Sequence, residues 1–110
     1  MKESESLNRI FHALADPTRR AILAKLAERE ITIGELAEPF KMTLAAVSKH
    51  VRVLEKAGFI RREIDGRIHR CSAELEPFKN ISAFVDRYKK YWNGQLDVLE
   101  KYLRNSPNPR

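Results

Sequence analysis

Residues 43–72 read TLAAVSKHVRVLEKAGFIRREIDGRIHRCS, and the first half of this stretch predicts a helix with defined ends. The Thr43 hydroxyl can accept a hydrogen bond from a free backbone N–H of the first turn, and Gly58 stands where helices commonly end in a left-handed residue. Apolar side chains recur between these ends at steps of three and four, at Leu44, Val47, Val51 and Leu54. This spacing predicts that one side of the helix faces a core.

The other side of this helix carries small residues, a hydroxyl and two cations, at Ala45, Ser48, Lys49 and Arg52. A B-DNA major groove admits a helix with such a surface. After the helix, residues 59–64 and 67–72 read as two strands joined at the pair Asp65-Gly66, which is typical of a type I′ hairpin. A helix followed by a basic hairpin predicts a winged DNA-reading element with Arg67 at its tip.

The positive charge of the chain is concentrated in the same stretch. The whole chain carries a net charge of +6, and residues 43–72 hold seven Lys and Arg against three acidic residues, a net +4. With a sequence pI near 9.7, this distribution is typical of a protein whose partner is a phosphate backbone. The alternative is a solvated basic surface without a partner.

The length of 110 residues predicts one domain, residues 1–104, followed by a disordered tail, residues 105–110. We expect no membrane span and no signal peptide, because no apolar run is long enough. The single cysteine, Cys71, excludes an intrachain disulfide, so we expect a cytoplasmic protein. No catalytic motif is present, which predicts that the chain is not an enzyme.

Three further helices are predicted ahead of the reading element. The first contains Leu7 to Leu14, and the second begins at Pro17 with Asp16 as its cap. The third covers residues 33–40 with Thr32 as its cap, and a turn at Lys41-Met42 leads to the fourth. The predicted fold is mainly α with a small β-hairpin, a winged helix-turn-helix in which the fourth helix is the recognition helix.

The C-terminal segment predicts assembly into a homodimer. Apolar side chains recur there from Phe78 to Leu103 at steps of three or four, as in a coiled coil, and Asn93-Gly94 is a candidate break. A small domain offers little to cover so long an apolar face, so we expect the N- and C-terminal helices to pair with a second chain. The alternative is packing within the protomer's own core. The predicted interface contains Leu7, Ile10, Phe11, Leu14, Tyr88, Trp92, Leu96, Leu99 and Leu103.

Two motifs resemble the ArsR-type (ArsR/SmtB) family of bacterial transcriptional regulators. They are DPTRRAIL at residues 16–23 and VSKHVRVL at residues 47–54, followed by Ala57-Gly58 and the wing, and the match covers residues 7–72. The resemblance implies a winged-helix homodimer that binds an operator near its own promoter and usually represses. The ending YKKYWNGQLDVLEKYL, residues 88–103, is similar to a metal-independent subgroup of that family.

The metal sites of the resembled family are not matched. Where metal-sensing members read ELCVCDL, residues 30–36 read EITIGEL, with Thr32 and Gly34 at the cysteine positions. The other family site uses Asp and His on the last helix, and residues 78–103 contain no histidine. Zinc and softer metals need thiolate or imidazole ligands, so we expect no metal and no cofactor.

The main hypothesis is a dimeric, sequence-specific repressor that binds an inverted repeat in double-stranded DNA. One alternative is a repressor that responds to redox or metal through Cys71, with His69 nearby or with a disulfide across the dimer, although an inert strand residue is the simpler interpretation. The other is a winged-helix module that binds proteins. His50 can donate to a phosphate or cover the helix edge. The predicted DNA contacts are Thr43, Ala45, Ala46, Ser48, Lys49, His50, Arg52, Arg62 and Arg67.

Overall fold

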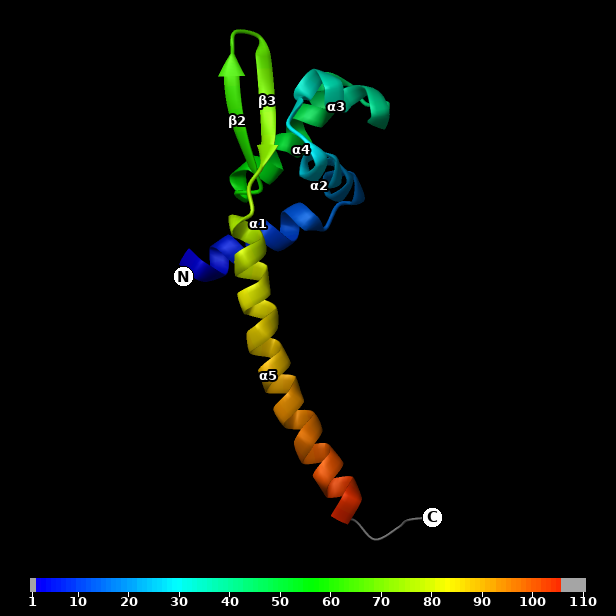
Figure 1. Ribbon diagram of the computed structural model, residues 1–110, viewed down its shortest axis with the longest axis vertical. Coiled ribbons are helices and arrows are strands. Elements are labelled where there is room, and N and C mark those ends of the chain that lie inside the picture. Colours follow the sequence, from blue (N-terminus) through cyan, green and yellow to red (C-terminus); the bar gives the residue numbers. More distant parts are fainter. Residues whose placement is uncertain (1, 106–110) are drawn as a thin grey trace.

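The computed structural model describes residues 2–105, where four helices and a small sheet form a head and a long fifth helix projects from it (Figure 1). The arrangement confirms the predicted winged helix-turn-helix. Its elements in chain order are α1 (Lys2–Leu14), α2 (Pro17–Glu28), β1 (Ile31–Thr32), α3 (Ile33–Phe40), α4 (Leu44–Lys56), β2 (Ile60–Asp65), β3 (Ile68–Ala73) and α5 (Glu76–Asn105).

Side chains cap three of the helices at the predicted residues. Asp16 accepts from the backbone N–H of Arg19 at 3.0 Å, and this hydrogen bond lowers the pKa of the Asp16 carboxyl. Thr32 and Glu35 form a reciprocal capping box at the start of α3. Thr43 accepts from the N–H of Ala46 at 3.1 Å. These local bonds fix where α2, α3 and α4 begin.

One core holds the head together. It is built on fully buried side chains of α2, α3 and α4, among them Ile22, Leu36 and Val51. Ile10 of α1 is only 1% exposed, so it belongs to the core of its own protomer. Its assignment to the dimer interface is therefore wrong.

The prediction that Leu44 faces the core is also wrong. Val47, Val51 and Leu54 are fully buried, whereas Leu44 is 58% exposed. Leu44 is the first residue of α4, so it lies at the edge of the core, where it lines a cleft beside the wing.

The sheet has three antiparallel strands in the order β1-β3-β2, and its first strand was not predicted. β1 contributes only two residue pairs, Ile31↔Cys71 and Thr32↔Arg70, and two residues give no alternating pattern in a sequence. The hairpin was predicted, but its turn lies one residue later than expected. Asp65 still pairs with Ile68, so the loop is Gly66-Arg67. Gly66 has a φ of 62° and Arg67 has no positive φ, which is the type II′ pattern rather than type I′.

α5 runs without interruption from Glu76 to Asn105, through the Asn93-Gly94 pair that was predicted as a possible break. Asn105 is the last residue of this helix rather than the first of the tail. Residues 106–110, the rest of the predicted disordered tail, lie outside the described residues. A helix of 30 residues is about 45 Å long and so supplies more than half of the 72 Å long dimension of the molecule.

Gly58 sets the direction in which the chain leaves α4 for the wing. Its φ is 87°, and its N–H donates to the Glu55 carbonyl at 3.0 Å, while the N–H of Phe59 donates to the Leu54 carbonyl at 2.9 Å. This pair of bonds is a Schellman motif. Phe59 and Leu54 are both fully buried, so the end of the helix is anchored in the core.

We expect Gly58→Ala to lower the free energy of unfolding by about 1–2 kcal/mol, because an L-residue is strained in the left-handed region. The added Cβ would also lie 3.3 Å from Cγ of Pro77. Urea denaturation followed by circular dichroism measures the change. Gly94→Ala is the control, since its Cβ would meet nothing within 4 Å. Alanine in the middle of a helix should stabilise it by about 0.5–1 kcal/mol. Equal effects at the two positions would contradict the role assigned to Gly58.

Candidate nucleic-acid interface

α4 exposes a row of side chains that includes most of the predicted reading surface. Ala45, Lys49 and Arg52 are exposed and lie on one side of the helix at steps of four and three residues. Lys56 continues the row by four residues and is also exposed. It was missing from the predicted contacts, although its position in the helical period places it with the other three. The row therefore presents three cations.

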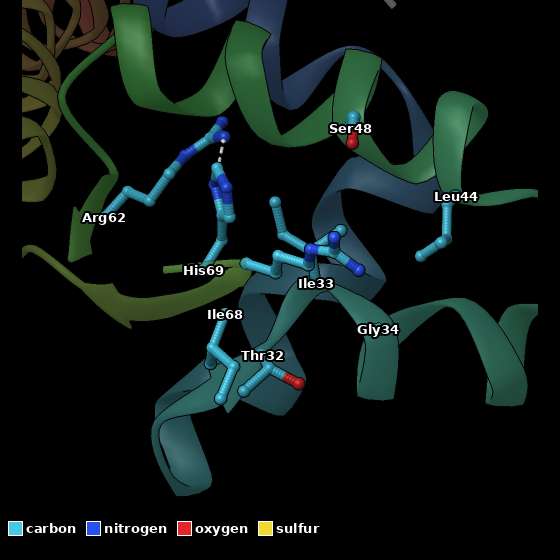
Figure 2. A pocket seen from close by; sticks show the side chains of 9 residues that line it. Thr32, Ile33, Gly34, Leu44, Ser48, Arg62, Ile68 and His69 are labelled. Atoms are coloured by element: carbon cyan, nitrogen blue, oxygen red, sulfur yellow. Dashed lines mark hydrogen bonds between the residues drawn. The ribbon is translucent and has the colours of Figure 1, made fainter. Parts of the chain in front are cut away.

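A second row of α4 lies beside the wing. Leu44 and Ser48 line a cleft of about 450 Å³ between α4, the start of α3 and the hairpin (Figure 2). Ser48 is half-buried there, so it stands at the border between the cleft and the exposed row. The remaining wall comes from the beginning of α3 and from the wing, with Thr32, Ile33, Gly34, Arg62, Arg67, Ile68 and His69.

Two other predicted contacts lie at the beginning of α4. Thr43 is exposed, and its hydroxyl is engaged in capping the helix. Ala46 is half-buried and presents only a methyl group. Both residues belong to the end of α4 where the first backbone N–H groups have no carbonyl partner within the helix and the helix dipole is positive. That end of a helix favours an approaching phosphate.

His50 lies on a third side of α4, against the junction of α1 and α2. Its Nδ1 is 3.4 Å from Nη1 of Arg19 and 4.0 Å from Oδ2 of Asp16. Arg19 also donates to the carbonyls of His12, at 2.9 Å, and Ala13, at 2.8 Å. His50 is thus part of a polar joint between three helices, which supports the interpretation that it covers the helix edge.

Arg62 is held inside the protomer, although its sequence position suggested a DNA contact. Its side chain is only 14% exposed, and Nη2 donates to Oε1 of Glu55 at 3.0 Å. Its Nη1 lies 3.1 Å from Nδ1 of His69, the contact drawn in Figure 2. Arg67, in contrast, is exposed in the turn at the tip of the wing. Of the four arginines in the hairpin, Arg62 and Arg67 therefore differ in role.

Cys71 lies in the middle strand of the sheet with no exposed surface. Burial raises the pKa of its thiol, which opposes formation of the reactive thiolate. A disulfide across a dimer requires an accessible sulfur. The structure therefore argues against the alternative in which Cys71 senses redox state.

The predicted dimer residues of α5 form an uncovered apolar face on the single chain. Trp92 is 57% exposed, and the large apolar residues that follow it on the same face are more than half exposed as well. From Trp92 onward, this exposure contradicts the alternative that the stripe packs in the protomer's own core, whereas Phe78 and Ile81 at its beginning do pack against that core. The exposed residues that follow Trp92 on this face are Leu96, Leu99 and Leu103.

α1 meets the beginning of α5 through aromatic rings. Phe11 lies edge-on to Phe84 with ring centroids 5.2 Å apart, and Phe84 lies 4.7 Å from Tyr88. Leu7 and Leu14 are half-buried. Phe11 and Tyr88 both remain substantially exposed, so the predicted N-terminal and C-terminal contributions adjoin on one surface.

None of the helices between residues 2 and 105 combines the length and the hydropathy that a membrane span requires.

Known proteins share this architecture and much of the sequence. A family profile described as a helix-turn-helix domain matches residues 14–63, from the end of α1 into β2. The HTH-type transcriptional regulator Rv2034 of Mycobacterium tuberculosis is 42% identical over 96 residues, covering 87% of each chain. The crystal structure of the ArsR family transcriptional regulator RHA00566 is 44% identical, has a TM-score of 0.79, and covers 82% of this chain and 93% of that one.

This chain belongs to the ArsR family. It is a DNA-binding transcriptional regulator, as the sequence predicted. The transcriptional repressor SdpR of Bacillus subtilis is also similar, at 39% identity over 54 residues, 49% of this chain and 60% of that protein.

In this ArsR-family regulator we expect the thiol of Cys71 to react with a disulfide reagent at least about a hundredfold more slowly in the native protein than in denaturant, because it has no exposed surface. The release of chromophore at pH 8 measures the rate. The control is Ser82→Cys in a Cys71→Ala background, since Ser82 is exposed on α5. Native reactivity that equals this control would restore the redox alternative.

Proposed function

We propose that this regulator is a homodimeric repressor that binds an inverted repeat in double-stranded DNA. The exposed row of α4, with Lys49, Arg52 and Lys56, carries the proposal, because a cationic helix face beside a basic wing fits a major groove and its flanking phosphates. Arg67 at the wing tip then contacts the adjacent backbone or the minor groove. The buried free thiol of Cys71 fits action in the reducing cytoplasm.

The contacts divide by side-chain chemistry and position. Arg52 and Ser48 reach base edges, where a guanidinium can bond a guanine in two places. Ala45 and Ala46 allow the helix to approach closely, and Thr43 lies at the end of α4 that faces phosphate. Lys49, Lys56 and Arg67 contact phosphates and supply sequence-independent affinity. His50 and Arg62 leave the proposed set, since both are held by partners within the protomer.

A second copy of the chain is the proposed partner of the apolar face on α5. The face extends from Tyr88 to Leu103, and Leu7 and Phe11 of α1 border it at the head. Pairing two such helices buries a stripe that would otherwise remain in water. A twofold dimer also brings two copies of α4 to one side of a DNA duplex, as an inverted repeat requires.

We propose further that DNA binding does not depend on a metal. Thr32 occupies one family cysteine position, and its hydroxyl is engaged in the capping box of α3. Gly34 occupies the other and has no side chain. Neither residue offers the thiolate that zinc or softer metals need. The repressor activity of a relative, SdpR, supports repression as the outcome of binding.

We expect Arg52→Ala or Ser48→Ala to weaken operator binding by about 1–3 kcal/mol and to reduce discrimination against other sequences, because a base contact is lost. Lys49→Ala should weaken binding to all sequences and reduce the salt slope by about 1, because a phosphate contact is lost. Fluorescence anisotropy over a salt series measures both effects, on a site found by footprinting upstream of the gene.

Lys101→Ala removes the same charge and is the control for the reading-surface variants, since Lys101 lies in the last turns of α5. That end of α5 projects away from the head (Figure 1). Lys101→Ala should leave operator affinity nearly unchanged. If Arg52→Ala and Ser48→Ala bind as wild type while folded, α4 does not read bases. If the protein retains no DNA site at all, the protein-binding module becomes the better hypothesis.

We expect sedimentation to show a dimer at micromolar concentration. In that dimer we expect the two recognition helices to lie ~34–36 Å apart, which matches one turn of DNA. Trp92→Ala and Leu99→Ala should weaken the dimer at least about tenfold, since each removes a large apolar side chain from the proposed interface. Lys90→Ala, at an exposed position on the opposite side of the same helix, is the control. A wild-type monomer at these concentrations would overturn the proposed assembly.

A further inference from the structure

Three side chains connect the recognition helix to the wing, and we propose that they set the wing's position and thereby the reach of Arg67 to DNA. They are Glu55 of α4, Arg62 of β2 and His69 of β3, here called the Arg62 cluster. The proposal rests on the function above, in that α4 and the wing contact the same DNA. In it, the members of the Arg62 cluster are positioning residues that act through Arg67.

The geometry of the Arg62 cluster leaves little freedom. Arg62 bonds Glu55 at 3.0 Å through Nη2 and approaches His69 Nδ1 at 3.1 Å through Nη1. A guanidinium has donors only, so His69 Nδ1 must be the acceptor and carry no proton. The Arg62 Nε is buried and has no hydrogen-bond partner within residues 2–105. The largely covered cation therefore depends on Glu55 and His69, and loss of either leaves its charge with fewer partners.

The Arg62 cluster lies at a point along the hairpin where it can affect the position of the tip. β1 supports β3 only at Cys71 and Arg70, whereas the pairing of β2 with β3 continues outward to Asp65↔Ile68. His69 is the first residue of β3 beyond the end of β1 toward the tip. The Arg62 cluster thus holds the hairpin where the support of the third strand ends. Arg67 lies two residues further out, in the turn.

Because Glu55 is acidic, the direction in which its removal changes DNA affinity distinguishes a positioning role from simple electrostatics. Removing an acidic side chain near DNA strengthens binding if only long-range electrostatics acts, since less negative charge faces the phosphates. Removing Glu55 also releases Arg62, which the proposal expects to displace the wing and weaken binding. Glu63 offers a matched control, because it lies next to Arg62 on β2 and is exposed.

The experiment measures operator affinity of Glu55→Ala, with and without Arg67→Ala, in a double-mutant cycle. We expect Glu55→Ala to weaken binding about fivefold, as is usual for coupled residues, and Glu63→Ala to leave binding unchanged or strengthen it. In the Arg67→Ala background the effect of Glu55→Ala should fall below about twofold. A purely structural effect of Glu55 would persist without Arg67. Thermal unfolding confirms that each variant is folded.

A second pair of variants tests the cluster from the side of the wing. His69→Asn retains a side-chain acceptor near the place of Nδ1, and His69→Leu removes it. We expect Asn to keep operator affinity within about twofold of wild type and Leu to lose as much as Glu55→Ala. Since this pair leaves Glu55 in place, it tests the proposal even if Glu55→Ala does not fold.

Each outcome has one meaning. Stronger binding by Glu55→Ala, an equal loss with and without Arg67, or equal behaviour of His69→Asn and His69→Leu would overturn the positioning role. Arg67→Ala alone tests the proposed function. If it binds as wild type, the wing does not contact DNA, and the positioning role falls with it. If Arg67→Ala weakens binding, and Glu55→Ala has the same effect with and without Arg67, the DNA contact stands and only the positioning role is overturned.

Discussion

The burial of one side of α4 is the constraint on which the rest of the molecule depends. Val47, Val51 and Leu54 have no exposed surface, so the rotation of the helix about its axis is fixed by the core. Every other side of α4 is then determined. One row, at Lys49 and Arg52, must face solvent, and the next row must face the wing. The same packing that stabilises the head therefore orients the surface that we propose as the DNA contact.

Local chemistry explains which parts of this fold could be predicted from the sequence. Helix starts at Asp16, Thr32 and Thr43 were predictable because a cap is a bond between residues three apart in the chain. β1 was not predictable, since two residues show no periodicity and the strand exists only through its pairing with β3. The turn residue was missed for a similar reason. Strand register, set by pairing along the whole hairpin, decided that Gly66 rather than Asp65 begins the loop.

The residues of the candidate site could be predicted only where the helical period determines which way their side chains point. Ala45, Lys49 and Arg52 were placed correctly on α4 by spacing, and the same spacing could have included Lys56. Arg62 could not be placed this way. Its inward orientation depends on a carboxylate seven residues earlier and an imidazole seven residues later, and no sequence pattern shows that the chain brings them together. An arginine in a basic stretch looks the same whether it meets a phosphate or an internal partner.

Affinity and discrimination place different demands on this surface. A net charge of +6 attracts any nucleic acid, because phosphate contacts need only cations that can reach the backbone. Discrimination also needs the helix to be held in register with the base edges, and contacts to the phosphates are what fix that register. The wing tip has little packing of its own, with Ile64 and Ile68 both exposed. Its geometry must therefore be set at the root of the hairpin, where Gly58 fixes the exit from α4 and Arg62 joins the strands to that helix.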